Sequence, residues 1–230
     1  MKSKGVKVSA IIVAAGVGSR MGTSVPKQFV EVLGKPIIAY TINSVSMCVD
    51  VDEIIVVTNS DYLVYMKDIV DTFGFKKVKK IVCGGKSRPE SVANGLKEVS
   101  KESTVVAVHD GARPMIDPDV FSKCIKSAEK FGCAAVGVKM KDTVKMSDDN
   151  GFIEYTVNRE KLWQIQTPQV FKKEIICSLY ESSVNNLVAT DDCFLAEQAG
   201  YKVKLVEGKY ENIKITTPQD IHIMTGLLGG

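Results

Sequence analysis

The chain has 230 residues, of which 45% are hydrophobic and 25% charged, so it can bury a full core and is expected to form one domain over residues 1–230. Its 30 basic and 27 acidic residues give a net charge of +3, which is too balanced for a surface that binds nucleic acid across the whole protein. No apolar segment is long enough to cross a membrane, so we expect neither nucleic acid nor a membrane as a partner.

Six cysteines are scattered along the chain without a C-x-x-C pair, and only two histidines are present. This pattern argues against a structural zinc site. Most of the cysteines lie in apolar segments, where a free thiol behaves as a small hydrophobic residue. We therefore expect a cytoplasmic protein whose cysteines are reduced.

The first apolar run, Val8–Val13, merges into a glycine-containing loop without a cleavage region, so we interpret it as a buried parallel strand rather than a secretory signal. The loop reads A-A-G-V-G-S-R-M-G over residues 14–22, and P-K-Q-F follows at residues 26–29. Glycines at the end of such a strand bring backbone N–H groups close to phosphate oxygens, while Arg20 and Lys27 would add positive charge. The loop therefore predicts a cradle for a polyphosphate.

Two common phosphate-binding motifs do not fit this loop. A dinucleotide fingerprint needs a third glycine where Met21 stands, and a Walker A loop needs glycine, not Pro26, before its lysine. A glycine-rich turn with two solvated cations remains an alternative interpretation of the loop alone.

Short apolar runs then alternate with longer helix-like segments, which is typical of an α/β fold. Further strands are expected at residues 53–58, 78–83, 104–109 and 134–138, and helices at residues 36–48, 61–73, 87–99 and 117–131. Ser87 and Glu90 have the spacing of a capping box, which predicts a helix start there. Right-handed crossovers give a doubly wound, Rossmann-like, mostly parallel sheet with its site at the carboxyl edge.

The alternation stops after Met140. Residues 141–160 predict a β-hairpin around the Asn150-Gly151 turn. Because an isolated hairpin is only marginally stable in water, we expect it to protrude as an arm that packs on a second copy and makes a dimer. An arm folded back onto its own domain is the alternative.

Four polar clusters end strands or follow them, and each also has a plain structural interpretation. The clusters are H-D-G-A-R-P at 109–114, T-V-N-R-E-K-L-W leading to Q-T-P-Q at 156–169, A-T-D-D at 189–192 and N-I-K-I-T-T-P at 212–218. The plain interpretations are a salt-bridged turn, a surface arm anchored by Trp163, a helix N-cap, and a strand end with a helix cap.

Taken in order, these motifs closely resemble the 2-C-methyl-D-erythritol 4-phosphate cytidylyltransferases of the non-mevalonate isoprenoid pathway, from about Val8 to Asp220. The resemblance implies a fold of the nucleotide-diphospho-sugar transferase type and transfer of CMP from CTP to the polyol phosphate, with release of pyrophosphate. The related pentitol-phosphate cytidylyltransferases, which make CDP-ribitol, share the first loop, P-K-Q-F, Q-T-P-Q and the last motif. H-D-G-A-R-P, D-T-V-K at 142–145 and R-x-x-L-W at 159–163 are closer to the erythritol branch, and the ribitol phosphate enzyme is the alternative.

The resemblance also implies roles for individual residues. Catalytic roles fall to Arg20, Lys27, Arg159 and Lys214. CTP contacts fall to Ala14, Ala15, Gly16, Val17, Gly18, Ser19, Gly85, Lys86 and Ser91, and acceptor contacts to Asp110, Arg113, Thr143, Thr167 and Thr190. Lys86 stands where some relatives have an acidic residue, so only a backbone contact is implied there.

The family likeness implies Mg²⁺ or another divalent cation held mainly through the CTP phosphates, and no protein ligand for it is assigned. It also implies a homodimer in which each acceptor site is completed by the partner's arm. A non-catalytic nucleotide-binding module is a further alternative. A sugar-1-phosphate nucleotidyltransferase would share the first loop but fits the arm and Q-T-P-Q less well.

Overall fold

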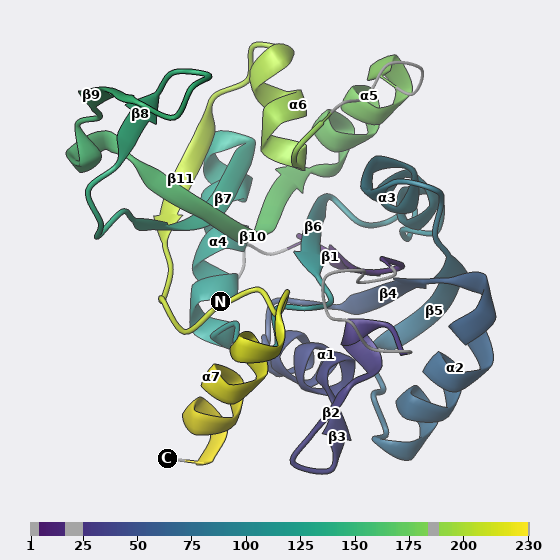
Figure 1. The fold of residues 1–230 in the computed structure, drawn as a ribbon. Helices are drawn as coiled ribbons and strands as arrows, with labels where there is room; N and C mark the ends of the chain where they lie inside the picture. The colour runs from purple at the N-terminus through teal and green to yellow at the C-terminus, as the bar shows by residue number, and fades with distance from the viewer. Residues whose placement is uncertain (1–4, 17–24, 184–188, 230) are drawn as a thin grey trace.

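The structure is a computed structural model that describes residues 5–16, 25–183 and 189–229, and its centre is a seven-stranded sheet in the order β11-β7-β10-β6-β1-β4-β5 (Figure 1). Six of these strands run in one direction, and β10 runs against its neighbours β6 and β7. The strands are β1 (Val8–Ala14), β4 (Glu53–Thr58), β5 (Val78–Cys83), β6 (Val105–Asp110), β7 (Cys133–Lys139), β10 (Trp163–Lys172) and β11 (Val203–Glu207). The predicted α/β fold with a mostly parallel sheet is confirmed.

The strand order reverses beside β1. The chain moves from β1 outward to β4 and β5, and then returns to place β6 on the other side of β1. At the carboxyl ends, Val13 pairs with Val57 on one side and with Asp110 on the other. Ligands of open α/β sheets bind at such a switch point, so the fold directs attention to the loops after β1 and β6.

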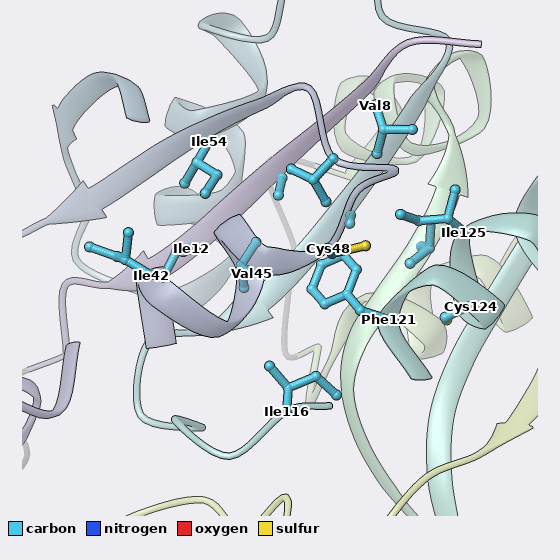
Figure 2. Close-up of a cluster of buried hydrophobic side chains, with 14 of the residues drawn as sticks. Val8, Ile12, Ile42, Val45, Cys48, Ile54, Ile116, Phe121, Cys124 and Ile125 are labelled. Atoms are coloured by element: carbon cyan, nitrogen blue, oxygen red, sulfur yellow. The ribbon is translucent and has the colours of Figure 1, made fainter. Parts of the chain in front are cut away.

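Helices cover both faces of the sheet, which explains why the central strands are apolar on both sides. Alternate residues of β1 supply the two cores, since Ile12 packs with residues of α1, α2 and α4, while Ile11 packs with residues of α3, α5 and α6. Figure 2 shows part of the first core around Phe121. The helices are α1 (Ile37–Met47), α2 (Leu63–Thr72), α3 (Arg88–Lys97), α4 (Pro118–Phe131), α5 (Lys173–Ser183), α6 (Asp192–Gln198) and α7 (Pro218–Gly229).

A third, smaller core fixes the C-terminal segment. Ile215 and Met224 of this segment pack with Val32 of the short β2 (Glu31–Val32) and β3 (Lys35–Pro36) ribbon and with Ile37 of α1. The N–H of Ile215 also donates to the carbonyl of Ala112, at 2.8 Å. These contacts hold the preceding residue, Lys214, beside the end of β6.

Two predicted helices show how local chemistry sets their starts. The N–H of Glu90 donates to the Ser87 hydroxyl at 3.2 Å, and that hydroxyl donates to the Glu90 carboxylate at 3.1 Å, so the predicted cap of α3 is present. The helix expected from residue 61 instead opens with the 3-10 turn η3 (Ser60–Tyr62), because Asn59 accepts the N–H of Asp61. The α-helix α2 therefore starts later, at Leu63.

The segment after the arm differs from its plain interpretation as a surface arm. Residues 163–172 form β10, a strand between β6 and β7 in the middle of the sheet. Its inner residues Gln166, Thr167 and Gln169 are buried. Their side chains are hydrogen-bonded, which compensates for the loss of water around polar groups in a sheet interior.

The predicted hairpin is present and projects from the main body of the protein (Figure 1). It consists of β8 (Lys145–Ser147) and β9 (Ile153–Thr156), paired antiparallel, with the 3-10 turn η4 (Arg159–Lys161) after it. The turn needs Gly151, whose φ of 85° lies in the left-handed region that glycine adopts without strain.

No helix among the residues that the structure describes is long and apolar enough to cross a membrane.

Two helical glycines offer a matched test of how tightly α3 packs on the sheet. A Cβ at Gly95 would lie 2.7 Å from Cγ2 of Ile11 and 3.0 Å from Cγ2 of Val57, whereas a Cβ at Gly226 would meet nothing within 4 Å. We expect Gly95→Ala to destabilise the fold by about 1–3 kcal/mol, because overpacking outweighs the gain in helix propensity. Gly226→Ala should stabilise it by about 0.5 kcal/mol in urea unfolding. Equal effects of both substitutions would contradict the close contact at Gly95.

Candidate active site

A first cavity lies at the carboxyl ends of β1, β4 and β5. It has a volume of about 380 Å³ and is bordered by the loops that follow these three strands. Its lining residues are Ala15, Asn59, Ser60, Gly84, Gly85, Lys86 and Glu90. The structure therefore brings the start of the first loop and the turn before α3 to one place, as the sequence predicts.

Two glycines allow that turn to pack closely. A Cβ at Gly84 would lie 2.3 Å from Cβ of Ala15, and a Cβ at Gly85 would lie 2.3 Å from Cβ of Glu90. Beneath the turn, the buried Ser91 hydroxyl accepts the N–H of Gly85 at 3.1 Å and donates to the carbonyl of Ser87 at 2.9 Å. Ser91, predicted to contact CTP, thus holds the turn in shape from below.

Gln28 is a site residue that the sequence argument did not single out. Its buried side-chain amide donates to the carbonyls of Ala14 at 2.6 Å and Gly16 at 3.1 Å. These bonds fix the start of the first loop against η2 (Lys27–Phe29), so Lys27 is held beside the end of β1. Of the predicted loop residues, Val17, Gly18, Ser19 and Arg20 lie outside the described residues.

A second cavity, of about 210 Å³, lies at the end of β6 on the other side of the switch point. All five residues that were predicted for the acceptor side and lie outside the arm line this cavity, namely Asp110, Arg113, Thr167, Thr190 and Lys214. The lining residues are Arg88, Asp110, Arg113, Ile165, Gln166, Thr167, Gln169, Thr190, Asp191 and Lys214. A neighbouring cavity of about 410 Å³ shares Arg113, Gln166 and Lys214 with it, so the polar region is larger than one cavity.

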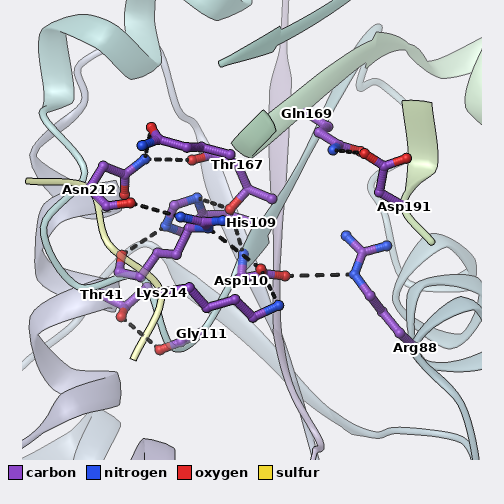
Figure 3. Close-up of polar contacts among 12 residues, drawn as sticks. Thr41, Arg88, His109, Asp110, Gly111, Thr167, Gln169, Asp191, Asn212 and Lys214 are labelled. Atoms are coloured by element: carbon purple, nitrogen blue, oxygen red, sulfur yellow. Dashed lines mark hydrogen bonds and ion pairs between the residues drawn. The ribbon is translucent and has the colours of Figure 1, made fainter. Parts of the chain in front are cut away.

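Asp110 is the electrostatic centre of the second cavity (Figure 3). Its carboxylate lies 2.8 Å from Nζ of Lys214, and 3.6 Å from Nε of both Arg88 and Arg113. Burial alone would raise the pKa of this carboxyl, but the three cations outweigh burial and hold the pKa well below its usual value. The carboxylates of Asp110 and Asp191 also line the cavity, and Arg88 is paired with the buried Asp192, so Lys214 and Arg113 are the cations best placed to attract a phosphorylated ligand.

His109 and Thr167 form a buried pair below Asp110. Nε2 of His109 lies 3.1 Å from the carbonyl of Arg113, which can only accept, so Nε2 carries the proton of the neutral ring. Nδ1 then accepts the Thr167 hydroxyl at 3.0 Å, and the Thr167 oxygen accepts the N–H of Asp110 at 3.0 Å. The donor of Thr167 is therefore used internally, and its oxygen can only accept a further hydrogen bond from a ligand.

Arg88 and Gln169 also belong to this cavity, although the sequence argument assigned them no role. Arg88 pairs with the buried Asp192 at 2.8 Å, across 104 positions of the chain. The Gln169 side chain donates to Asp191 at 2.8 Å and accepts the N–H groups of Asp192 and Cys193. The position of Arg88, just after a strand end at the same sheet edge, was the available signal.

Two predicted acceptor residues stand apart from both cavities in the single chain. Thr143 and Arg159 are exposed on the arm, and neither is among the residues that line the three cavities described above. Nη1 of Arg159 donates to the carbonyl of Lys141 at 2.7 Å, within the base of the arm. The fold therefore does not bring these two residues to the Asp110 cavity of their own chain.

Because the chain has only two histidines, removal of His222 leaves a single imidazole signal that tests the buried His109–Thr167 pair. Burial lowers the pKa of His109 from 6.5 to about 4. The unfolded chain thus takes up this proton first, and stability from the neutral ring, present above pH 6.5, is lost as the pH falls towards 4. In a His222→Gln variant, the remaining imidazole NMR signal should titrate near pH 4 in the folded protein. Protonation of His109 should lower the free energy of unfolding by about 3 kcal/mol at pH 4, and this loss should be absent in His109→Asn. Titration of folded His109 near pH 6.5 would refute the assignment.

Comparisons with known proteins agree on one family. Residues 8–229 match the family described as 2-C-methyl-D-erythritol 4-phosphate cytidylyltransferase, IspD. A protein of that name from Clostridium botulinum is 47% identical over 216 residues, which cover 94% of each chain.

Solved structures give the same result. The 4-diphosphocytidyl-2C-methyl-D-erythritol synthase from Anaerococcus prevotii superposes with a TM-score of 0.88 at 37% identity, covering 98% of this chain and 97% of its own. The 2-C-methyl-D-erythritol 4-phosphate cytidylyltransferase from Thermus thermophilus superposes with a TM-score of 0.78 at 28% identity, covering 98% of this chain and all of its own. With the match over residues 8–229, these similarities establish that the chain belongs to the 2-C-methyl-D-erythritol 4-phosphate cytidylyltransferase family.

Proposed function

We propose that this chain transfers the cytidylyl group of CTP to 2-C-methyl-D-erythritol 4-phosphate and releases pyrophosphate. The observation that carries the proposal is the pair of polar cavities on either side of the β1–β6 switch point, one rich in backbone turns and one in cations. Family membership favours this acceptor over ribitol 5-phosphate, and an enzyme over a non-catalytic nucleotide-binding module.

The first cavity receives CTP in this proposal. In the turn before α3, the N–H groups of Gly84, Gly85 and Lys86 are already bonded within the chain, so this turn offers its carbonyl groups to the nucleotide. The loop that begins at Ala15 leads into residues 17–24. Lys27 and Arg20 bind the triphosphate and stabilise the charge that builds up at the α-phosphorus and the leaving group. Gly85 and Lys86 contact the base and ribose through their backbone.

The second cavity receives the acceptor. Lys214 and Arg113 are the cations that attract its phosphate, while Asp110 and Thr167 accept hydrogen bonds from its hydroxyl groups. Thr190 lines the same cavity and adds a hydroxyl at its rim. Because the Thr167 hydroxyl hydrogen is bonded to His109, the Thr167 oxygen can only accept a hydrogen bond, so it favours a substrate that carries a hydroxyl group at this point.

The reaction needs alignment more than proton transfer. An oxygen of the acceptor phosphate bonds to the α-phosphorus of CTP, and the bond from that phosphorus to the bridging oxygen breaks as pyrophosphate leaves. A phosphate monoester with a second pKa of about 6 is already largely dianionic at neutral pH, so no general base is required. The chain holds the two anionic substrates in line and neutralises their repulsion with fixed cations.

A divalent cation, Mg²⁺ or another, held mainly by the CTP phosphates, would supply positive charge that stabilises the developing negative charge of the reaction. The donor set of the site fits a cation held mainly by the nucleotide. The carboxylate at the centre of the acceptor cavity, Asp110, is already paired with three cationic side chains. The described residues also include no group of three or more His, Cys, Asp or Glu side chains that could hold a metal ion.

The arm acts on a second copy of the chain in this proposal. Its two-stranded hairpin exposes several large apolar side chains, among them Phe152, which is 73% exposed, and Ile153, which is 65% exposed. Exposed apolar clusters of this kind mark interaction surfaces. Packing on a partner would cover them and bring Arg159 and Thr143 to the partner's acceptor cavity.

A reducing cytoplasm suits the six cysteines, all of which are free thiols.

A pyrophosphate-release screen tests the activity. CTP, UTP and ATP are each combined with 2-C-methyl-D-erythritol 4-phosphate and ribitol 5-phosphate in the presence of Mg²⁺, and the first polyol with CTP should give the highest kcat/KM. Lys27→Ala and Arg20→Ala should each lower kcat by roughly 10²–10³-fold, because each removes a charge that stabilises the transition state.

Lys67→Ala is the matched control for these two variants, since Lys67 is an exposed lysine of α2 away from both cavities. It should retain wild-type turnover. Faster turnover of ribitol 5-phosphate would replace the proposed acceptor, and absence of pyrophosphate release with every pair would favour a nucleotide-binding module.

Subunit mixing tests the shared acceptor site. Arg159→Ala and Lys214→Ala should each be nearly inactive alone, because each removes one cation from every site. If the arm serves the partner, a heterodimer of the two variants contains one intact site, so an equal random mixture should recover about a quarter of wild-type activity. No recovery, with a mixed dimer present by mass spectrometry, would place the arm residue in its own chain's site.

A further inference from the structure

Arg88 occupies the boundary between the two cavities. It is the first residue of α3, directly after the Ser87 cap and the turn that lines the nucleotide cavity, yet its side chain lines the acceptor cavity. The resemblance gives it no role. Its guanidinium is therefore a charged group at the acceptor site whose backbone belongs to the nucleotide side.

The guanidinium is held from the far side by a buried carboxylate. Nη2 of Arg88 lies 2.8 Å from Oδ2 of Asp192, whose side chain is only 1% exposed. The other oxygen of Asp192 accepts the Tyr180 hydroxyl at 2.5 Å, and its backbone N–H donates to Gln169. Asp192 does not line any of the cavities described above. Asp192 is thus a buried, hydrogen-bonded anchor behind Arg88.

Toward the cavity, the same guanidinium faces Asp110 (Figure 3). Nε of Arg88 lies 3.6 Å from Oδ1 of Asp110, whereas Lys214 and Arg113 both face the other oxygen, Oδ2. The carboxylate is therefore drawn in two directions. Without Arg88, both remaining cations would attract it to one side, and Oδ1 would lose its fixed direction.

We propose that Arg88 is a positioning residue that fixes the orientation of the Asp110 carboxylate for the acceptor, with Asp192 as its anchor. The inference rests on the proposed function, because it is the acceptor molecule whose hydroxyl groups would donate hydrogen bonds to Asp110. A planar guanidinium is suited to this task, since it can address two carboxylates at once, whereas a lysine ammonium is a single point of charge.

Two variants and one control test the inference. Arg88→Lys keeps the positive charge but loses the planar guanidinium that reaches two carboxylates. Asp192→Asn keeps an oxygen that can accept the Tyr180 hydroxyl but removes the negative charge that anchors Arg88. Both should raise KM for the polyol phosphate by roughly tenfold or more, the usual cost of losing a charge-assisted contact, and leave KM for CTP nearly unchanged. Lys80→Gln, which breaks the exposed Lys80–Glu98 pair between β5 and the residue after α3, should change neither KM.

The effect of Asp192→Asn is the decisive readout, because Asp192 can influence the acceptor only through its neighbours in the cavity wall. Melting temperatures of all variants are measured in parallel. A lower melting temperature with both KM values unchanged would show that Arg88 only supports the fold, and an equal rise of both KM values would show a general distortion. Either result overturns the inference.

Failure of the proposed function has a different signature, since the wild-type protein itself would then release no pyrophosphate with this acceptor. In that case crystal structures of the wild type and Asp192→Asn decide. We expect the Arg88 guanidinium to turn away and the Asp110 carboxylate to rotate in the variant. An unchanged carboxylate would overturn the inference independently of turnover.

Discussion

The constraint on which the site depends is the burial of one carboxylate among three cations. Asp110 at the end of β6 is paired with Lys214, Arg113 and Arg88, which come from three separate parts of the chain. An unpaired carboxylate at this depth would be costly, and so would three unpaired cations, so each group makes the burial of the others acceptable. The C-terminal segment and the start of α3 are thereby joined to the centre of the sheet. The same arrangement places the cationic groups of Lys214 and Arg113 in the cavity wall.

The sequence was sufficient for those parts whose pattern is local. The strands at residues 53–58 and 78–83 were predicted with their observed bounds, because short runs containing Ile and Val alternate there with segments long enough for crossover helices. The convergence of Asp110, Arg113 and Lys214 was predicted from the family's motif order and from strand ends that share one edge. The hairpin followed from the Asn150-Gly151 turn.

The sequence was insufficient where burial depends on distant partners. The strand at residues 163–172 contains five polar residues, one of them a lysine, and a proline, a composition that does not indicate a central strand. It is stable there because Gln166, Thr167 and Gln169 find hydrogen-bond partners on β6, α6 and the C-terminal segment. The pairing of Arg88 with Asp192 likewise exists only once α3 and α6 lie together. Neither arrangement has a local signature.

The arm leaves the sheet at the end of β7 and returns into β10, two strands that are paired with each other. The N–H of Met140 donates to the carbonyl of Leu162 at 3.1 Å and closes the base of this excursion. Residues 141–161 can therefore change in length or composition without altering the register of the sheet, as loops closed at their base generally can. The nucleotide half and the arm are separate units of variation. A descendant of this chain could acquire a new partner by rebuilding the arm alone, whereas a new acceptor would also require changes in the cavity around Asp110.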